Sequence, residues 1–235
     1  DLTPGRAVWA VAWPMAALGL LRTGYYLTDS YWVGQLGPKP LAALGGAAFA
    51  WWIISLLADL AGTGAQALIA RHEGAGARER MAPVLVQGLW VAGIVALVLA
   101  TAGFALRGVY FDLLGFDSAA EEHVLGRAYL GASLLGSGTL AVQYVLASAF
   151  RGLGQTRVAL KITAAALLAN AVLDPLFIWG LGPVPGLGIA GAAWATTASN
   201  AVGAVLAWRL LRAEGLHLRF VGPRLPEMRL LARIG

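Results

Sequence analysis

Four ionisable side chains lie inside long apolar stretches of the sequence. They are Arg22, Asp29, Asp59 and Asp174. An ionised side chain at the centre of a membrane helix costs at least about 2.5 to 3.5 kcal/mol, so each of them is a candidate for a functional role. Carboxylates supply the oxygen ligands that hard cations such as Na⁺ require, and they also take up protons. These residue types therefore predict binding of a small cation or a proton.

The carboxylates of Asp29 and Asp174 are expected to lie at the same depth. Asp29 lies five residues and Asp174 six residues before the glycine that ends its apolar stretch, or roughly 8 to 9 Å at about 1.5 Å per residue. Asn170 precedes Asp174 by one helical turn and shares its face. Thr196 lies in the following stretch at a depth similar to that of Asn170. These four side chains are predicted to converge in the outer half of the membrane.

The predicted cluster fits two kinds of ion. Na⁺ binds oxygen ligands, whereas two close carboxylates can share one proton because they repel each other when both are ionised. A simpler interpretation is that Asn170 and Thr196 only join helices by hydrogen bonds. The sequence has no cysteine, which excludes disulfides and thiolate metal sites. We expect no cofactor besides Na⁺ or H⁺ as the coupling ion.

Three further residues are assigned to a cavity or a hinge: Pro14, Tyr25 and Arg22. Arg22 lies two turns before Asp29, about 10 Å along the axis, with Tyr25 between them. Arg22 either balances the buried carboxylates or faces a water-filled cavity by itself. Pro14 removes a backbone hydrogen bond and predicts a kink, which is either a hinge or static. Asp59 is expected to meet cytoplasmic water or a helix partner.

Membrane-spanning helices must position these residues. About 20 predominantly apolar residues cross a hydrocarbon core of ~30 Å, and the stretches lack the alternation of membrane strands. The expected fold is therefore an all-α membrane protein with six transmembrane helices. Their predicted ranges are 7–33, 41–70, 83–106, 124–150, 158–179 and 187–208.

Composition and charge support this class. Of 235 residues, 59% are hydrophobic and 12% are charged, about half the charged share of roughly 25% in soluble domains. The net charge is +5, but the basic residues lie between the apolar stretches, so we expect no nucleic-acid partner. In the orientation with both termini cytoplasmic, 13 Lys and Arg lie inside and 3 outside, as the positive-inside rule requires.

Several motifs resemble the multidrug and toxic compound extrusion (MATE) transporters. Residues 29–37 (DSYWVGQLG) and 41–45 (LAALG) resemble the end of that family's first helix and the start of its second. Residues 151–157 (RGLGQTR) resemble its loop between helices four and five. Residues 170–175 (NAVLDP) and 188–196 (GIAGAAWAT) resemble its fifth and sixth helices.

The resemblance implies one lobe of a two-lobe transporter. By resemblance, the coupling-ion positions are Asp29, Asn170, Asp174, Thr196 and the carbonyl of Ala192. It likewise makes Pro14 the bend of the first helix and Tyr25 a cavity residue. Residues 1–212 are the expected N-terminal lobe, and 213–235 a cytoplasmic linker toward a second six-helix lobe, which is covalent in a longer chain or supplied by a second copy.

The function implied by the resemblance is Na⁺- or H⁺-coupled antiport. The protein is expected in the inner (plasma) membrane, among lipids, exporting organic and often cationic compounds by alternating access. A flippase of lipid-linked precursors is a second hypothesis, for which a more cationic cavity is expected. A third is a scaffold subunit whose internal polar residues only join helices. No combination of nucleophile, base and orienting group recurs, so no enzyme is predicted.

Overall fold

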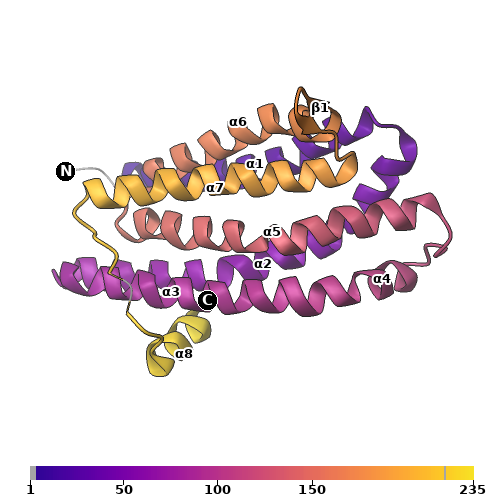
Figure 1. Cartoon of the computed structure of the whole chain (residues 1–235). Helices are drawn as coiled ribbons and strands as arrows, with labels where there is room; N and C mark the ends of the chain where they lie inside the picture. Colours follow the sequence, from indigo (N-terminus) through magenta and orange to yellow (C-terminus); the bar gives the residue numbers. More distant parts are fainter. Residues whose placement is uncertain (1–3, 220) are drawn as a thin grey trace.

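The protein forms a bundle of long antiparallel helices in a computed structural model that describes residues 4–219 and 221–235 (Figure 1). The helices that run the length of the bundle are α1 (Pro4–Gly34), α2 (Pro38–Gly74), α3 (Met81–Val98), α4 (Phe104–Leu113), α5 (Glu121–Gly152), α6 (Thr156–Trp179) and α7 (Ile189–Ala213). The short elements are η1 (Arg78–Arg80), η2 (Leu99–Gly103), the strands β1 (Gly180–Leu181) and β2 (Val184–Pro185), and α8 (Leu225–Ile234).

Five helices of the described chain are long and apolar enough to cross a membrane. They are Pro38–Gly74, Arg78–Leu113, Glu121–Gly152, Thr156–Trp179 and Ile189–Ala213. The predicted second to sixth stretches coincide with these helices. Most helix ends lie beyond the predicted ends, by up to seven residues, whereas α7 begins two residues after its predicted start. The first predicted stretch corresponds to α1, which has 31 residues. The count of six spans and the side on which each terminus lies stay predictions.

The third span differs most from its predicted range. It was expected to end at residue 106, but α3 continues through a π-helical turn, η2, into α4, which ends at Leu113. Phe111 near that end is completely buried, and α4 packs against α5. Tertiary contact with α5 therefore extends the helix past the point where the apolar run stops.

Helix α5 forms the centre of the bundle. It packs against α2, α7, α3 and α4, and 72% of its apolar window is buried, against 17% for the Arg78–Leu113 span. Without a hydrophobic driving force between helices in lipid, small residues provide close packing. Gly136 of α5 follows this rule, because a Cβ atom there would overlap the hydroxyl of Thr197 on α7.

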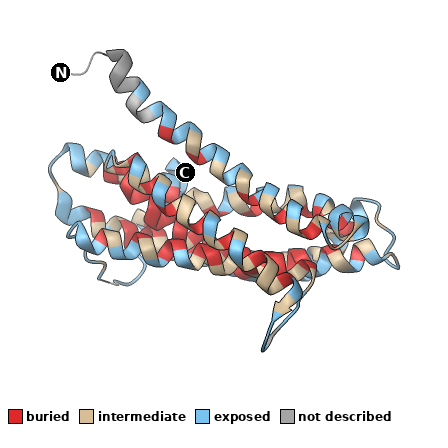
Figure 2. Ribbon diagram, turned by 90° about the horizontal axis from the view of Figure 1, so that it is seen from above, coloured by how far each residue is buried: buried red, intermediate tan, exposed pale blue. Residues whose placement is uncertain are grey.

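The N-terminal part of α1 leads away from the other helices, whereas its C-terminal part lies on the bundle (Figure 2). Helix α1 packs against α6 and α2, and it continues as an α-helix through Pro14. Pro14 lies inside α1, on the N-terminal side of the part that carries Arg22, Tyr25 and Asp29.

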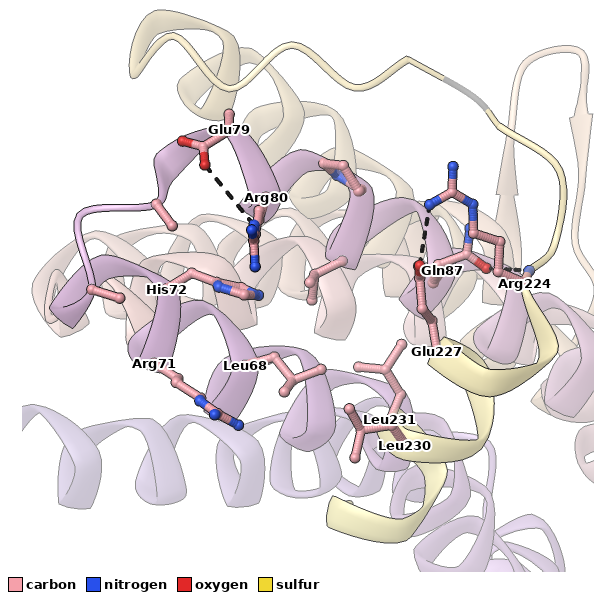
Figure 3. Close-up of a pocket in the computed structure, with 14 residues that line it drawn as sticks. Leu68, Arg71, His72, Glu79, Arg80, Gln87, Arg224, Glu227, Leu230 and Leu231 are labelled. Atoms are coloured by element: carbon pink, nitrogen blue, oxygen red, sulfur yellow. Dashed lines mark hydrogen bonds and ion pairs between the residues drawn. The ribbon is translucent and has the colours of Figure 1, made fainter.

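The segment predicted as a linker contains the helix α8. Met228 and Leu231, three residues apart on one face, are buried where α8 packs against α2 and α3. The buried side chain of Gln87 holds the preceding chain, accepting a hydrogen bond from the backbone N–H of Arg224 at 2.8 Å. A hollow of about 670 Å³ lies between α2, α3 and α8 (Figure 3).

Candidate functional site

The structure brings together the four side chains that the depth argument selected. Asn170 and Asp174 lie on α6, Thr196 on α7 and Asp29 on α1. The Asn170 amide donates a hydrogen bond to Asp174 Oδ1 at 3.0 Å and another to Thr196 Oγ1 at 3.2 Å. The Thr196 hydroxyl in turn donates to Asp29 Oδ2 at 3.4 Å. Three helices thus share one polar cluster, which we call the carboxylate cluster.

The connection between α6 and α7 sets the relative depth of these residues. Strands β1 and β2 pair antiparallel, with Gly180 opposite Pro185, and the chain then turns back at Gly188, which has a φ of 56°. A left-handed φ is readily adopted by glycine. Because α6 ends and α7 begins at this tight hairpin, the two helices run in opposite directions from it, and Asn170 and Thr196 lie at the same level, within hydrogen-bond distance of each other.

Tyr129 is a member of the cluster that sequence reasoning missed. It lies on α5 and is 3% exposed, and its hydroxyl donates a hydrogen bond to Asp29 Oδ2 at 3.3 Å. Tyr129 lies five residues after residue 124, where its apolar stretch was predicted to begin, and Asp29 lies five residues before Gly34, so the two depths match. A search for every polar side chain at that depth, rather than for ionisable ones alone, would have found it.

The cluster holds unsatisfied oxygen atoms away from solvent. Asn170 and Asp174 are 0% exposed and Asp29 is 4% exposed. Within the described chain, Asn170 Oδ1 and Asp174 Oδ2 have no hydrogen-bond partner, and neither carboxylate forms an ion pair with a basic side chain. Buried carboxylates need a compensating charge or a proton. The donor set of carboxylate, amide and hydroxyl oxygens suits a hard monovalent cation.

Arg22 forms no ion pair with the carboxylate cluster in the described chain, although Arg22 and Thr196 line one small cavity. Its guanidinium donates a hydrogen bond to Asp59 Oδ2 at 2.9 Å and lies 4.6 Å from the ring centre of Tyr144. Arg22 therefore pairs with Asp59. Of the two environments expected for Asp59, cytoplasmic water or a partner on another helix, the structure shows the second. Arg22 was expected either to balance the buried carboxylates or to face a cavity. It lines a cavity of about 470 Å³ between α1 and α2.

Two assigned residues lie near the cluster, and one basic residue was placed wrongly. Tyr25 is buried, and its hydroxyl has no partner among the described residues. Ala192, one turn before Thr196, is completely buried. Arg151 was counted as a loop charge, but α5 extends past it and its side chain is only 9% exposed. Arg151 Nε donates to Gln66 Oε1 at 2.7 Å, and its guanidinium approaches Asp59 at 3.6 Å.

Comparison with known proteins identifies the family. Residues 14–176, which include most of the carboxylate cluster, match the family model described as MatE. The chain belongs to the MatE family.

Relatives of this MatE chain include multidrug resistance proteins. It is 27% identical over 232 residues to the probable multidrug resistance protein NorM of Thermotoga maritima, covering 96% of the chain and 49% of that relative. It is 30% identical to the NorM protein of Acinetobacter baylyi, covering 88% and 44%. A crystal structure of MATE in the bent conformation superposes with a TM-score of 0.85 at 28% identity, covering 98% and 51%.

MatE proteins are multi-pass transporters of the plasma membrane and are not enzymes, as the sequence analysis expected. The chain spans about half the length of the relatives that it matches, so the fold corresponds to one lobe of a MatE transporter.

Proposed function

We propose that the protein is a cation-coupled antiporter that exports small organic compounds by alternating access, with Na⁺ or H⁺ bound at the carboxylate cluster. One observation carries the proposal: Asp29 and Asp174 are buried together and have no basic partner in the described chain. The names of the NorM relatives support multidrug efflux as the transport function. A second lobe, in the same polypeptide or from a second copy, completes the transport cavity in this proposal.

The physical argument is electrostatic. Removing an ionised carboxylate from water costs several kcal/mol even after the protein relaxes, and a second carboxylate nearby adds repulsion. Binding of Na⁺ or H⁺ cancels part of this unfavourable charge. An ion that enters from outside thus stabilises the arrangement of α1, α6 and α7 that holds it, and its release on the other side destabilises that arrangement. This difference in affinity is what couples ion movement to a conformational change.

The test is export from proteoliposomes that contain the complete protein. A fluorescent amphiphile is loaded, and a Na⁺ gradient, a proton gradient or both are imposed. Gradient-dependent export is expected with at least one ion. Equal efflux with and without either gradient would contradict coupling, and a protein that binds ions without moving any organic compound would fit the scaffold hypothesis.

Na⁺ and protons are predicted to compete for the carboxylate cluster. If the two carboxylates share a proton, Na⁺ binding releases it, and Na⁺ affinity falls by up to about tenfold for each unit by which the pH is lowered through the titration. Isothermal titration in two buffers with different ionisation enthalpies measures the released protons directly. Na⁺ binding that is independent of pH and releases no proton would rule out a shared site.

Replacing Pro14 with alanine is predicted to slow export without weakening cation binding. The substitution allows a backbone hydrogen bond to the carbonyl of Ala10 and removes the proline clash, so α1 resists bending between its divergent part and the cluster. The matched control is Pro40→Ala in the first turn of α2, where a helix needs no backbone donor. Equal export by Pro14→Ala and the wild type would support a static kink.

A further inference from the structure

A second group of charges, which forms its ion pairs separately from the carboxylate cluster, lies where α1, α2 and α5 meet. Oδ2 of Asp59 lies 2.9 Å from Nη2 of Arg22, and Oδ1 of the same carboxylate lies 3.6 Å from Nη2 of Arg151. Two guanidinium groups against one carboxylate leave this group with an excess of one positive charge. We call it the arginine cluster: Arg22, Asp59 and Arg151.

We propose that the arginine cluster recognises an anionic group, a carboxylate or a phosphate, on the organic compound that the protein exports. The inference rests on the proposed export function and names its substrate class. It replaces, for this chain, the cationic substrates that the family resemblance implied.

The arginine cluster forms the charged part of two neighbouring cavities. Arg22 and Asp59 line both the cavity of about 470 Å³ and another of about 360 Å³, and Arg151 lines the second. Within the described chain these are the only charged residues that line either cavity. Cavities of roughly 300 to 1,000 Å³ with a few polar groups are typical of small-molecule sites.

Aromatic side chains line the larger cavity beside the charges. Tyr26, Trp51 and Trp52 contribute flat surfaces, and Trp52 is 57% exposed and stacks against Phe49 with ring centres 5.9 Å apart. A planar apolar body fits such a surface, and its anionic group would then lie within reach of Arg22. The shape and the charge thus indicate the same kind of ligand, an amphiphilic organic anion.

The arrangement favours an anion over a cation for two reasons. Asp59 already has two basic neighbours, so an incoming cation would meet a net positive charge and be repelled by it. Arg22, in contrast, is 43% exposed and uses only one contact to Asp59, whereas a guanidinium carries five donors. Its remaining donors can hold a carboxylate or phosphate in two parallel hydrogen bonds.

Equilibrium binding to the purified complete protein tests the proposal without any ion gradient. Two pairs of fluorescent probes are compared, each with a similar ring body and a different charge. Carboxyfluorescein and tetramethylrhodamine methyl ester test the carboxylate, and flavin mononucleotide and riboflavin test the phosphate. The anionic probe is expected to bind about ten- to a hundredfold more tightly in at least one pair, because hydrogen bonds to charged groups contribute about 1.5 to 3 kcal/mol. The pair that discriminates identifies the group.

Variants of the cluster give effects of opposite sign. Arg22→Gln should lower the affinity for the anionic probe by at least about tenfold, whereas Arg22→Lys should retain part of it. Asp59→Asn should raise the affinity, because it removes the internal competitor for both arginines. The matched control is Arg209→Gln, an exposed residue outside both cavities, which removes the same charge and should leave binding unchanged.

Three results would overturn the proposal: no preference for the anionic probe in either pair, a preference that persists in Arg22→Gln, or a loss of anion binding in Asp59→Asn. The last result would indicate that the cluster only joins helices. Thermal unfolding of each variant shows whether it folds. If Arg22→Gln does not fold, the affinity of Arg22→Lys for the anionic probe is compared with that of the wild type instead. Probe binding is measured without an ion gradient, so it does not depend on ion coupling. A failure of ion coupling would appear only in the export assay with proteoliposomes.

Discussion

Asp174→Asn and Asp29→Asn are each expected to abolish gradient-driven export while the protein still folds and inserts. Asparagine keeps the shape of the side chain but carries no charge and takes up no proton, so the cluster loses a charged ligand. Hydrogen bonds and contacts to a charged group contribute about 1.5 to 3 kcal/mol, which corresponds to a ten- to hundredfold loss in cation affinity. Dye export from proteoliposomes and cation binding by calorimetry measure the two effects.

The control for these variants is Asp117→Asn. Asp117 is exposed between α4 and α5 and accepts a hydrogen bond from the N–H of Ala119, a bond that asparagine also makes. Its export should equal that of the wild type. Wild-type export by either cluster variant under the same gradient would remove the carboxylate cluster from the mechanism. Cation binding should also raise the unfolding temperature of the wild type and not that of Asp174→Asn, because only a bound ligand stabilises the folded state.

Gly191→Leu is expected to destabilise the protein strongly and to disable the carboxylate cluster with it. A Cβ atom on Gly191 would overlap the backbone carbonyl of Phe177, so α7 would have to move away from α6. Overpacking of this kind costs about 3 kcal/mol. The contact lies within about one turn of both Asp174 and Thr196, and separation of the two helices would break the hydrogen bond between Asn170 and Thr196.

Thermal unfolding in detergent measures the loss, and Gly93 provides the control. A Cβ atom on Gly93 in α3 meets no atom within 4 Å, so Gly93→Ala should be neutral or slightly stabilising, because alanine favours helix more than glycine does. A Gly191→Leu protein that unfolds at the wild-type temperature and binds cations normally would show that α6 and α7 do not need this close contact.

The sequence alone determined the class of protein and the positions of most helices. Lipid offers no hydrogen bonds to a backbone, so a long apolar run has to be a helix, and the second to sixth predicted ranges fall on the observed spans. The helix ends were less predictable, because contacts with neighbouring helices decide them. Helix α4 extends to Leu113 where Phe111 is buried, and α8 depends on the surface of α2 and α3.

The carboxylate cluster could be anticipated because depth is a property of the sequence. A constant rise per residue converts a position in a helix into a height in the membrane. Asp29 and Asp174 share one height, and Asn170 and Thr196 lie about one turn deeper. What the sequence does not contain is the direction in which each helix faces its neighbours. Only the packing of α1, α2 and α5 decided that Arg22 meets Asp59 rather than the carboxylates, that Arg151 points inward, and that Tyr129 reaches Asp29. Helix rotation depends on side-chain fit between helices far apart in the chain, and for that reason it appears only in the tertiary structure.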